Sequence, residues 1–237
     1  DNVIINKYRI SFFKYLFLYD TYFPINFNIY DDYKNQIKQI SWANLERDKR
    51  VDSLIGIKPL KNYLNRAKNL KKIYGKRLIT ISLRESSYSK YRNSQKREWL
   101  KVCKYLEKRN FQPIIIRDFE YLKKLNDPLK KYEIAPEATF DLNYRAAIYN
   151  IAFHNFFTDS GYFPLSLLQK KPNLSRWKYD IKKNKKSYIS HLEGSVANKK
   201  FPNNYRLGGK KHYIFFKDDT YSNIKLFIDK YLLKIKH

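Results

Sequence analysis

Two short turns carry the residues most suited to chemistry in this sequence. Arg84 comes directly after the apolar run Leu78–Leu83, and Asp159-Ser160-Gly161 comes directly after the run Phe153–Thr158. An arginine suits bidentate contact with a phosphate. A Ser-Gly turn ahead of a helix offers backbone N–H groups and the positive end of the helix dipole. Both turns therefore suit a phosphate or a diphosphate.

Three further residues are candidates for the same site. Ser87 and Arg92 lie in the polar loop 85–94, and Arg145 lies on an expected helix. Two of the arginines have a structural alternative. Arg84 could form a surface ion pair with Glu85 or another nearby carboxylate, and Arg145 could be a solvated or paired charge at the edge of its helix.

Several kinds of site have no signature here. The four histidines are scattered without metal-ligand spacing, so we expect no metal. The sequence contains no glycine-rich dinucleotide fingerprint, no phosphate loop ending in Gly-Lys-Ser/Thr and no serine-nucleophile elbow. The single cysteine, Cys103, excludes an internal disulfide and indicates a reducing compartment, which predicts a cytoplasmic location.

The chain is strongly basic. It has 49 Lys and Arg against 22 Asp and Glu, a formal net charge of +27. Such a charge suits nucleic acid or an anionic membrane, and aromatic residues interleaved with lysines over 8–22 and 177–188 could stack bases. However, Lys, Asn, Ile, Tyr and Phe share A/T-rich codons. We therefore favour compositional bias, with an anionic substrate or membrane surface as partner, over dedicated nucleic-acid binding.

The elements that must position these residues begin with a helix over 58–74, whose apolar residues follow helical spacing and which Gly75 ends. The run 78–83 predicts a buried strand. Ser94 is expected to cap a helix reaching about Arg109, and 112–117 predicts a second strand. Together they predict a βαβ unit with a right-handed crossover and parallel strands.

The same alternation continues along the chain. A loop over 121–139 with a short helix leads to a helix that Asp141 caps. The strand 153–158 follows, and Pro164 marks the start of a short helix. The remaining expected elements are a polar, basic, loop-rich stretch over 171–203, a last strand over 213–216, and a final amphipathic helix capped by Asp218-Asp219-Thr220.

These elements predict an α/β fold, a Rossmann-like parallel sheet flanked by helices, over 76–237. Residues 1–75 are expected to form a mainly helical N-terminal segment, in which 31–50 has a polar helical pattern and 6–19 fits a helix or a buried strand pair. The carboxyl ends of parallel strands lie at one edge of a sheet, where such folds bind ligands. Both turns are therefore expected to meet there.

The chain contains no Met and begins at Asp1, which suggests a fragment or a processed product. Its most apolar stretch, 10–19, is interrupted by Lys14. That stretch is far shorter than the roughly 20 residues of a membrane span, so we expect no transmembrane segment.

The order of these features resembles the C-terminal half of bacterial GT-B-fold glycosyltransferases, and is most similar to distant relatives of heptosyltransferases and fucosyltransferases. The resemblance covers about residues 76–235. It is carried by strand-end residues and by the last strand and closing helix, namely Arg84, Arg92-Asn93-Ser94, Trp99, Asp118, Arg145, Thr158-Asp159-Ser160-Gly161, Tyr213–Phe216 and Asp218-Asp219-Thr220.

The resemblance implies that this half binds a nucleotide-sugar donor, with Arg84, Ser160 and Gly161 on its diphosphate and no metal or other cofactor. The sugar would pass to a glycan or lipid-linked acceptor in surface polysaccharide synthesis, in the cytoplasm or peripherally at the inner membrane face. Residues 1–75 are too short for a complete acceptor domain, so they are expected to be a remnant of one, and no catalytic base is assigned. The alternative is a basic nucleic-acid-binding module without catalysis.

Overall fold

The computed structural model describes residues 56, 58–87, 90–118, 126–158, 163–171, 173–178, 203–207 and 210–234. The chain divides into two compact units. One comprises Asp1–Val51 with Lys186–Val196, and the other comprises Asp52–Lys185 with Ala197–His237. All described residues belong to the second unit, so the predictions of a helix or a buried strand pair over 6–19 and of a polar helix over 31–50 lie outside them.

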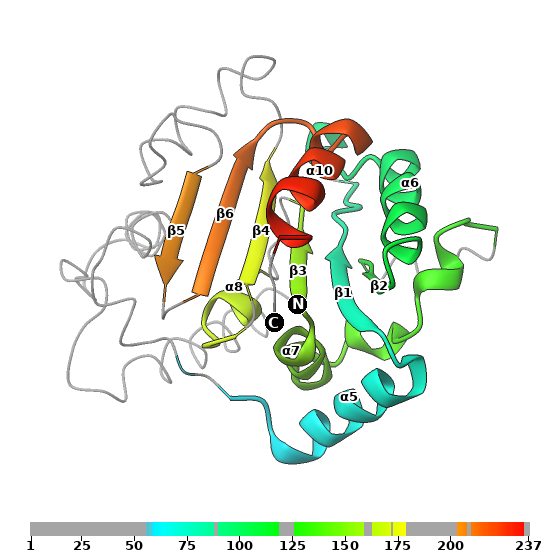
Figure 1. The fold of residues 1–237 in the computed structure, drawn as a ribbon. Coiled ribbons are helices and arrows are strands. Elements are labelled where there is room, and N and C mark those ends of the chain that lie inside the picture. The colour runs from blue at the N-terminus through cyan, green and yellow to red at the C-terminus, as the bar shows by residue number, and fades with distance from the viewer. Residues whose placement is uncertain are drawn as a thin grey trace, which may run out of the picture. The chain divides into compact units, whose positions relative to one another are not determined.

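A six-stranded sheet forms the centre of this unit (Figure 1). Its strand order is β2-β1-β3-β4-β6-β5, with five parallel strands and β5 antiparallel to β6. This arrangement confirms the predicted α/β fold with a parallel sheet. The strands are β1 (Arg77–Ser82), β2 (Phe111–Ile116), β3 (His154–Phe157), β4 (Asn173–Lys178), β5 (Asn203–Leu207) and β6 (Lys210–Phe216).

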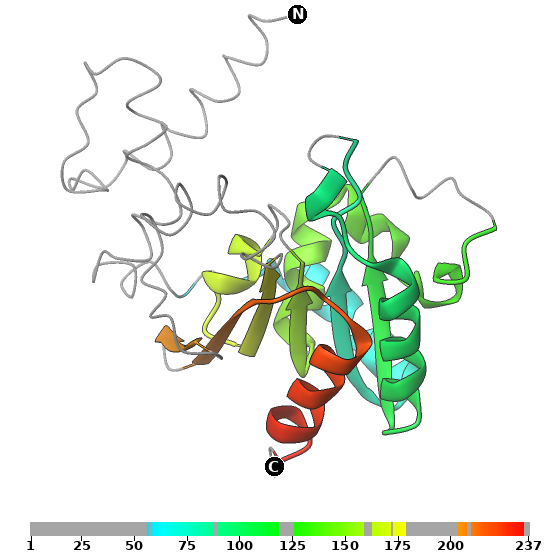
Figure 2. The same ribbon diagram turned by 90° about the horizontal axis from the view of Figure 1, so that it is seen from above.

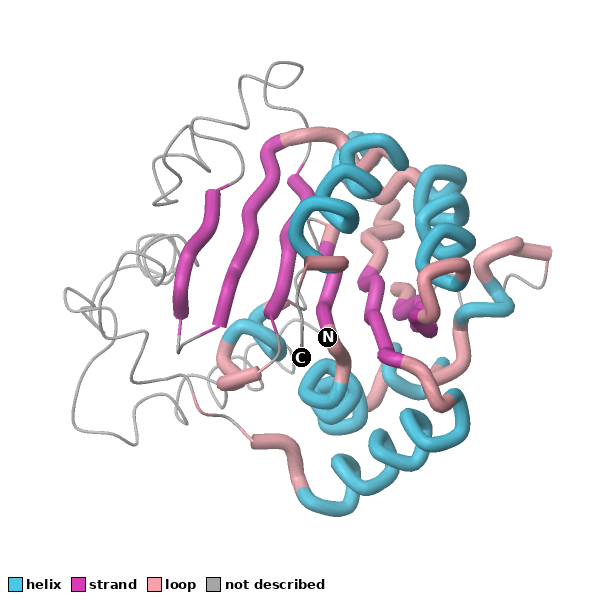
Figure 3. Tube along the Cα trace, viewed as in Figure 1, coloured by secondary structure: helices cyan, strands magenta, loops and turns pink. Residues whose placement is uncertain are grey.

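The helices lie on both sides of the sheet (Figures 2 and 3). They are α5 (Lys61–Tyr74), α6 (Lys96–Glu107), α7 (Leu142–Ile151), α8 (Pro164–Leu167) and α10 (Tyr221–Phe227), which continues as a π-helical turn, η6 (Ile228–Leu232). Short 3₁₀ turns lie at η1 (Lys90–Arg92), η3 (Lys130–Tyr132) and η4 (Pro136–Thr139). None of the helices within the described ranges is long and apolar enough to cross a membrane.

Alternating side chains of the strands supply two cores, one on each face of the sheet. On one face Ile79 and Phe156 pack with Trp99 of α6 and Phe227 of α10. The other core lies between the sheet and α5, α7 and α8; it includes Ala67, Leu70, Leu78, Ile148, Phe157 and Leu167. Helix α5 therefore packs into the same unit as the sheet, although it precedes the boundary predicted at residue 75.

Several local signals are confirmed. Gly75 ends α5 in the left-handed conformation (φ 59°), and its N–H donates to the carbonyl oxygen of Lys71. The Asp141 carboxylate caps α7 by accepting from the backbone N–H groups of Asn143 and Tyr144, each at 3.0 Å. Pro164 is the first residue of α8.

The prediction of a loop-rich stretch over 171–203 is wrong for its first part, because Asn173–Lys178 forms strand β4. It lies between β3 and β6 in the sheet. Leu174 and Trp177 are buried, but so are the polar residues Ser175 and Arg176, whose guanidinium stacks over the ring of Phe163 at 3.7 Å. Because Ser175 and Arg176 are polar, the sequence did not predict this interior strand, which pairs with β3 and β6.

Cys103 lies within the α6 core with no exposed surface, and burial raises the pKa of its thiol. Because the thiolate is the reactive form, we expect a disulfide reagent to react with the native chain on the order of a hundredfold more slowly than with the unfolded chain. Absorbance of the released thiol would measure both rates, with one equivalent per chain in denaturant as the control. Equal rates would contradict the burial of Cys103.

His154 is fully buried, and this burial lowers its pKa from 6.5 to about 3. As the pH falls below 6.5, the unfolded chain binds a proton that the folded chain binds only near pH 3. Stability should therefore fall with acidity by up to about 1.4 kcal/mol per pH unit from this group.

A His154→Asn variant removes this titration and keeps a polar group near the Ser175 hydroxyl, which lies 3.0 Å from His154 Nε2. Urea unfolding at about pH 7 and about pH 4.5 should show the wild type losing about 2–3 kcal/mol more than the variant. Equal losses would show that His154 titrates normally.

Candidate functional site

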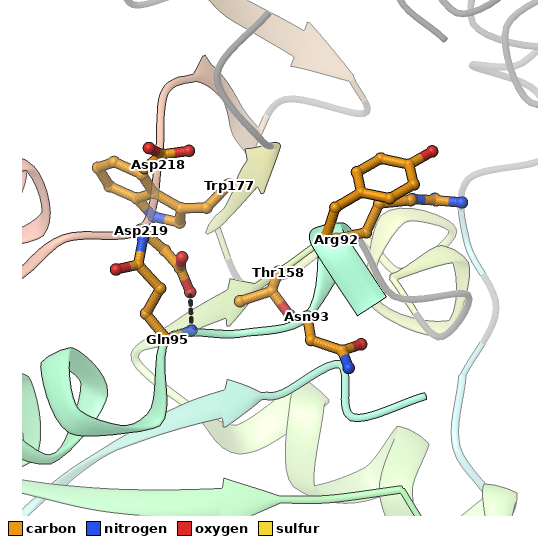
Figure 4. Close-up of a pocket in the computed structure, with 8 residues that line it drawn as sticks. Arg92, Asn93, Gln95, Thr158, Trp177, Asp218 and Asp219 are labelled. Carbon is orange, nitrogen blue, oxygen red and sulfur yellow. Dashed lines mark hydrogen bonds between the residues drawn. The ribbon is translucent and has the colours of Figure 1, made fainter. Parts of the chain in front are cut away.

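The carboxyl ends of four parallel strands border a pocket with a volume of about 310 Å³ (Figure 4). Thr158 follows β3, Trp177 belongs to β4, and two aspartates follow β6. The loop between β1 and α6 completes it. Among the described residues, the pocket is lined by Tyr91, Arg92, Asn93, Gln95, Thr158, Trp177, Asp218 and Asp219. The pocket lies beside the point where the chain, having run from β1 outward to β2, returns to β3 on the other side of β1.

Two buried hydroxyl groups join the ends of β1 and β3. The backbone N–H of Arg84 donates to Ser94 Oγ at 2.8 Å and to Thr158 Oγ1 at 2.9 Å. Ser94 Oγ in turn donates to Thr158 Oγ1 at 2.7 Å, and Thr158 donates to the carbonyl oxygen of Ser82 at 3.2 Å. We call Ser94 and Thr158 the hydroxyl pair. It holds both ends of the loop 84–94 against the end of β3.

The prediction that Ser94 caps α6 is therefore wrong. The helix begins after Gln95, which makes no side-chain capping hydrogen bond, and Asp219 accepts from the Gln95 backbone N–H instead. Ser94 lies one residue too early to act as the cap. Its hydroxyl accepts from the backbone N–H of Arg84 and donates to Thr158, which is 64 residues away.

A second contact shapes the loop that carries Arg92. The Asn93 side chain accepts from the Ser86 backbone N–H at 2.9 Å and donates to the Ser86 carbonyl at 2.8 Å. These paired bonds close the loop across seven residues. Arg92 is the last residue of η1 and comes directly before Asn93. Because Asn93 is fixed to Ser86, Arg92 lies at a defined position on the pocket wall.

The predicted site residues are distributed as follows. Arg92 lines the pocket, Arg84 lies half-buried at the carboxyl end of β1, and Ser87 is exposed. Asp159-Ser160-Gly161 lies outside the described residues, directly after Thr158. The sheet thus brings Arg84 and Arg92 to the edge that leads into the predicted Asp-Ser-Gly turn. Their contact with a donor stays a prediction.

Arg145 is placed differently. It is fully buried rather than solvated at a helix edge, and its guanidinium donates to the carbonyl oxygens of Ala138 and Thr139 in η4. It is not among the described residues that line the pocket. These contacts tie α7 to η4, and its predicted part in donor binding stays a prediction without further support.

Asp219 is a pocket residue that the sequence placed only in a helix cap. Within the predicted cap Asp218-Asp219-Thr220, it is Thr220 that caps α10, by accepting from the Asn223 N–H. Asp219 Oδ2 accepts from the Gln95 N–H at 3.0 Å and from the Trp99 indole N–H at 2.5 Å. Burial raises the pKa of Asp219, and these hydrogen bonds offset part of the rise. Two consecutive acids after a strand at the same sheet edge as Arg84 were the available sequence signal.

A buried ion cluster lies at the carboxyl end of β2. Arg117, which is 1% exposed, donates to Glu85 through Nε at 2.7 Å and to Glu133 at 2.9 Å, and it pairs with Asp127 at 2.7 Å. Burial alone would lower the pKa of Arg117, but the neighbouring carboxylates outweigh it and raise the pKa. Arg117 has no local signal in the sequence, because its partners are 10 to 32 residues away.

The cluster also restrains the loop after β1. Lys96 at the start of α6 lies 3.1 Å from Glu85 and 3.7 Å from Asp127. The Glu85 backbone N–H donates to Asp118 at 2.8 Å. Glu85 is the residue after Arg84, so the cluster fixes the backbone that carries Arg84.

Within the described ranges, no group of three or more His, Cys, Asp or Glu side chains could hold a metal ion.

No family model matches the sequence, and no curated protein matches it. Among solved structures, the chain is similar to a glycosyl transferase family 9 structure from Veillonella parvula, with 14% sequence identity and a TM-score of 0.46. The match covers 77% of this chain and 47% of the other, so this chain spans about half the length of that structure.

Replacing Arg117 should be strongly destabilising. Arg117→Met leaves the buried carboxylates of Glu85 and Glu133 without their shared partner, and we expect a loss of about 3–5 kcal/mol in the free energy of unfolding. Lys101→Met is the matched control, because it breaks the exposed pair with Glu98 and should cost less than about 1 kcal/mol. Urea unfolding would measure both. Similar losses for the two variants would contradict the assigned importance of the cluster.

Proposed function

We propose that this chain contains the donor-binding part of a glycosyltransferase, which transfers a sugar from a nucleotide-sugar to a glycan or lipid-linked acceptor. The observation that carries the proposal is the pocket at the carboxyl ends of β1, β3, β4 and β6, beside the reversal in strand order. Open α/β sheets bind nucleotides in this crevice. Of the residues that carry the resemblance to GT-B enzymes, Arg92, Asn93, Thr158, Asp218 and Asp219 line this pocket.

In the proposed reaction, an acceptor hydroxyl oxygen bonds to the anomeric carbon of the donor sugar. The bond between that carbon and the diphosphate oxygen breaks, and the nucleoside diphosphate departs with the electron pair. Arg92 and Arg84 would stabilise the developing negative charge, together with the predicted contacts of Ser160 and Gly161. The acceptor proton passes to a base that we leave unassigned.

The proposed setting is surface polysaccharide synthesis in the cytoplasm, with contact to the inner membrane face. The net charge of +27 supports an encounter with anionic substrates or anionic lipid. It is equally compatible with nucleic acid. The described part of the chain gives less support to that alternative, because the Trp177 ring is 2% exposed and stacked on Phe215, so it offers no open platform for a base.

Titration calorimetry with ADP, GDP, UDP and CDP tests the proposal. We expect at least one to bind, and Arg92→Gln or Arg84→Ala to weaken it about 10- to 100-fold, since hydrogen bonds to charged groups contribute about 1.5–3 kcal/mol. Arg84→Ala keeps the backbone N–H that binds the hydroxyl pair. Exposed Lys101→Gln on α6 is the charge-matched control and should bind normally.

Two outcomes would contradict the proposal. One is that the wild-type chain binds none of the four diphosphates. The other is that the tightest of them binds both arginine variants and the Lys101→Gln control with equal affinity.

A further inference from the structure

The indole N–H of Trp177 is a buried donor in the wall of the pocket. Trp177 is 2% exposed, and its Nε1 has no hydrogen-bond partner within the part of the chain that the structure describes. Leaving such a donor unsatisfied costs about 1–3 kcal/mol, and buried polar groups in native proteins are nearly always paired. Because Trp177 lines the pocket, a buried donor without a partner there points to a ligand atom.

The ring that carries this N–H is held in place. It stacks on Phe215 with 4.3 Å between centroids and an interplanar angle of 11°, and it meets Phe227 edge-on at 6.4 Å. Both partners belong to the buried core. These packing contacts hold the indole in one orientation, so its donor is preorganised for a ligand in the pocket.

Acidic side chains share this end of the pocket. Trp177 pairs with Phe215 across β4 and β6, and Asp218 and Asp219 follow β6 on the same edge. Figure 4 shows the two aspartates beside Trp177, whereas Arg92 lies apart from them, beyond Thr158. Asp219 already accepts from Gln95 and Trp99. The pocket therefore has an end with a donor beside acceptors, and an opposite end with a cation.

The chemistry of the two groups restricts what can bind between them. An indole N–H only donates, and an ionised carboxylate only accepts. A phosphate would accept from the indole but would be repelled by the carboxylates. A hydroxyl group can accept from one and donate to the other.

We propose that the Trp177 end of the pocket binds a hydroxyl-bearing part of the ligand, with Trp177 Nε1 donating to a hydroxyl oxygen and that hydroxyl donating to Asp218. The phosphates then lie toward Arg92. This inference rests on the proposed function and adds to it a specificity-determining residue and the direction in which the donor lies. The hydroxyl belongs to the ribose or to the transferred sugar.

Trp177→Phe tests the inference, because it removes the N–H and keeps an aromatic ring against Phe215. The probes are inorganic pyrophosphate, the tightest-binding nucleoside diphosphate, its 2′,3′-dideoxy counterpart and the same nucleotide carrying glucose. We expect the variant to bind pyrophosphate normally and the hydroxyl-bearing probe about 5- to 100-fold more weakly. A loss with the nucleoside diphosphate but not its dideoxy counterpart assigns the ribose. A loss with the glucose-bearing nucleotide alone assigns the sugar.

A second variant keeps the test valid if Trp177→Phe unfolds, which its thermal midpoint would reveal. Asp218→Ala should weaken the same hydroxyl-bearing probe and leave pyrophosphate binding unchanged or tighter, since it removes a negative charge.

Unchanged binding of every probe by both variants would overturn the inference and leave the proposed function standing. An equal loss with the dideoxy nucleotide or with pyrophosphate would also overturn it, since the indole would then bind the base or a phosphate. Failure of the wild type to bind any nucleotide would instead overturn the proposed function, and the inference with it.

Discussion

The hydrogen bonds of the Thr158 hydroxyl hold the candidate site together. This one side chain accepts from the Arg84 backbone and from Ser94, and it donates to the carbonyl of Ser82. Parallel pairing places the ends of β1 and β3 side by side, but it does not determine the path of the loops that leave them. The hydroxyl pair determines that path, because both ends of the loop 84–94 converge on Thr158. With 4% of Thr158 and 9% of Ser94 exposed, little water competes for these bonds.

The buried ion cluster restrains the same loop from its other side. Among the described residues, Arg117, Lys96 and Lys130 form ion pairs with Glu85, Asp127 and Glu133. Ion pairs of this kind gain little net stability, because desolvation offsets their attraction. What they supply here is a defined position for Glu85, and through the backbone for Arg84. A half-buried cation at a strand end needs such support if it is to meet a ligand in one geometry.

The pocket that results has two chemically different ends. Arg92 lies on a loop closed by Asn93 and Ser86, and the aspartates lie on a turn anchored to α6 through Asp219. These anchors come from separate segments of the chain that meet only at the carboxyl edge of the sheet. A ligand that carries both phosphates and hydroxyls matches this polarity better than a simple anion does.

The sequence by itself determined the elements whose causes are local. Gly75 ends α5 and Asp141 starts α7 because each acts on the backbone within four residues of itself. The alternation of strands and helices was enough to predict a parallel sheet and the edge at which we expect a ligand to bind. Only the tertiary structure decided which residues line the pocket and which residues hold them in place. Ser94 binds Thr158 across 64 residues, and Asp219 binds Trp99 across 120. Trp177 was hidden in a stretch that looked like a loop, because its strand is polar and gains stability only between β3 and β6. Side-chain partners separated by such distances leave no periodic pattern in a sequence, so only the folded sheet could bring them together.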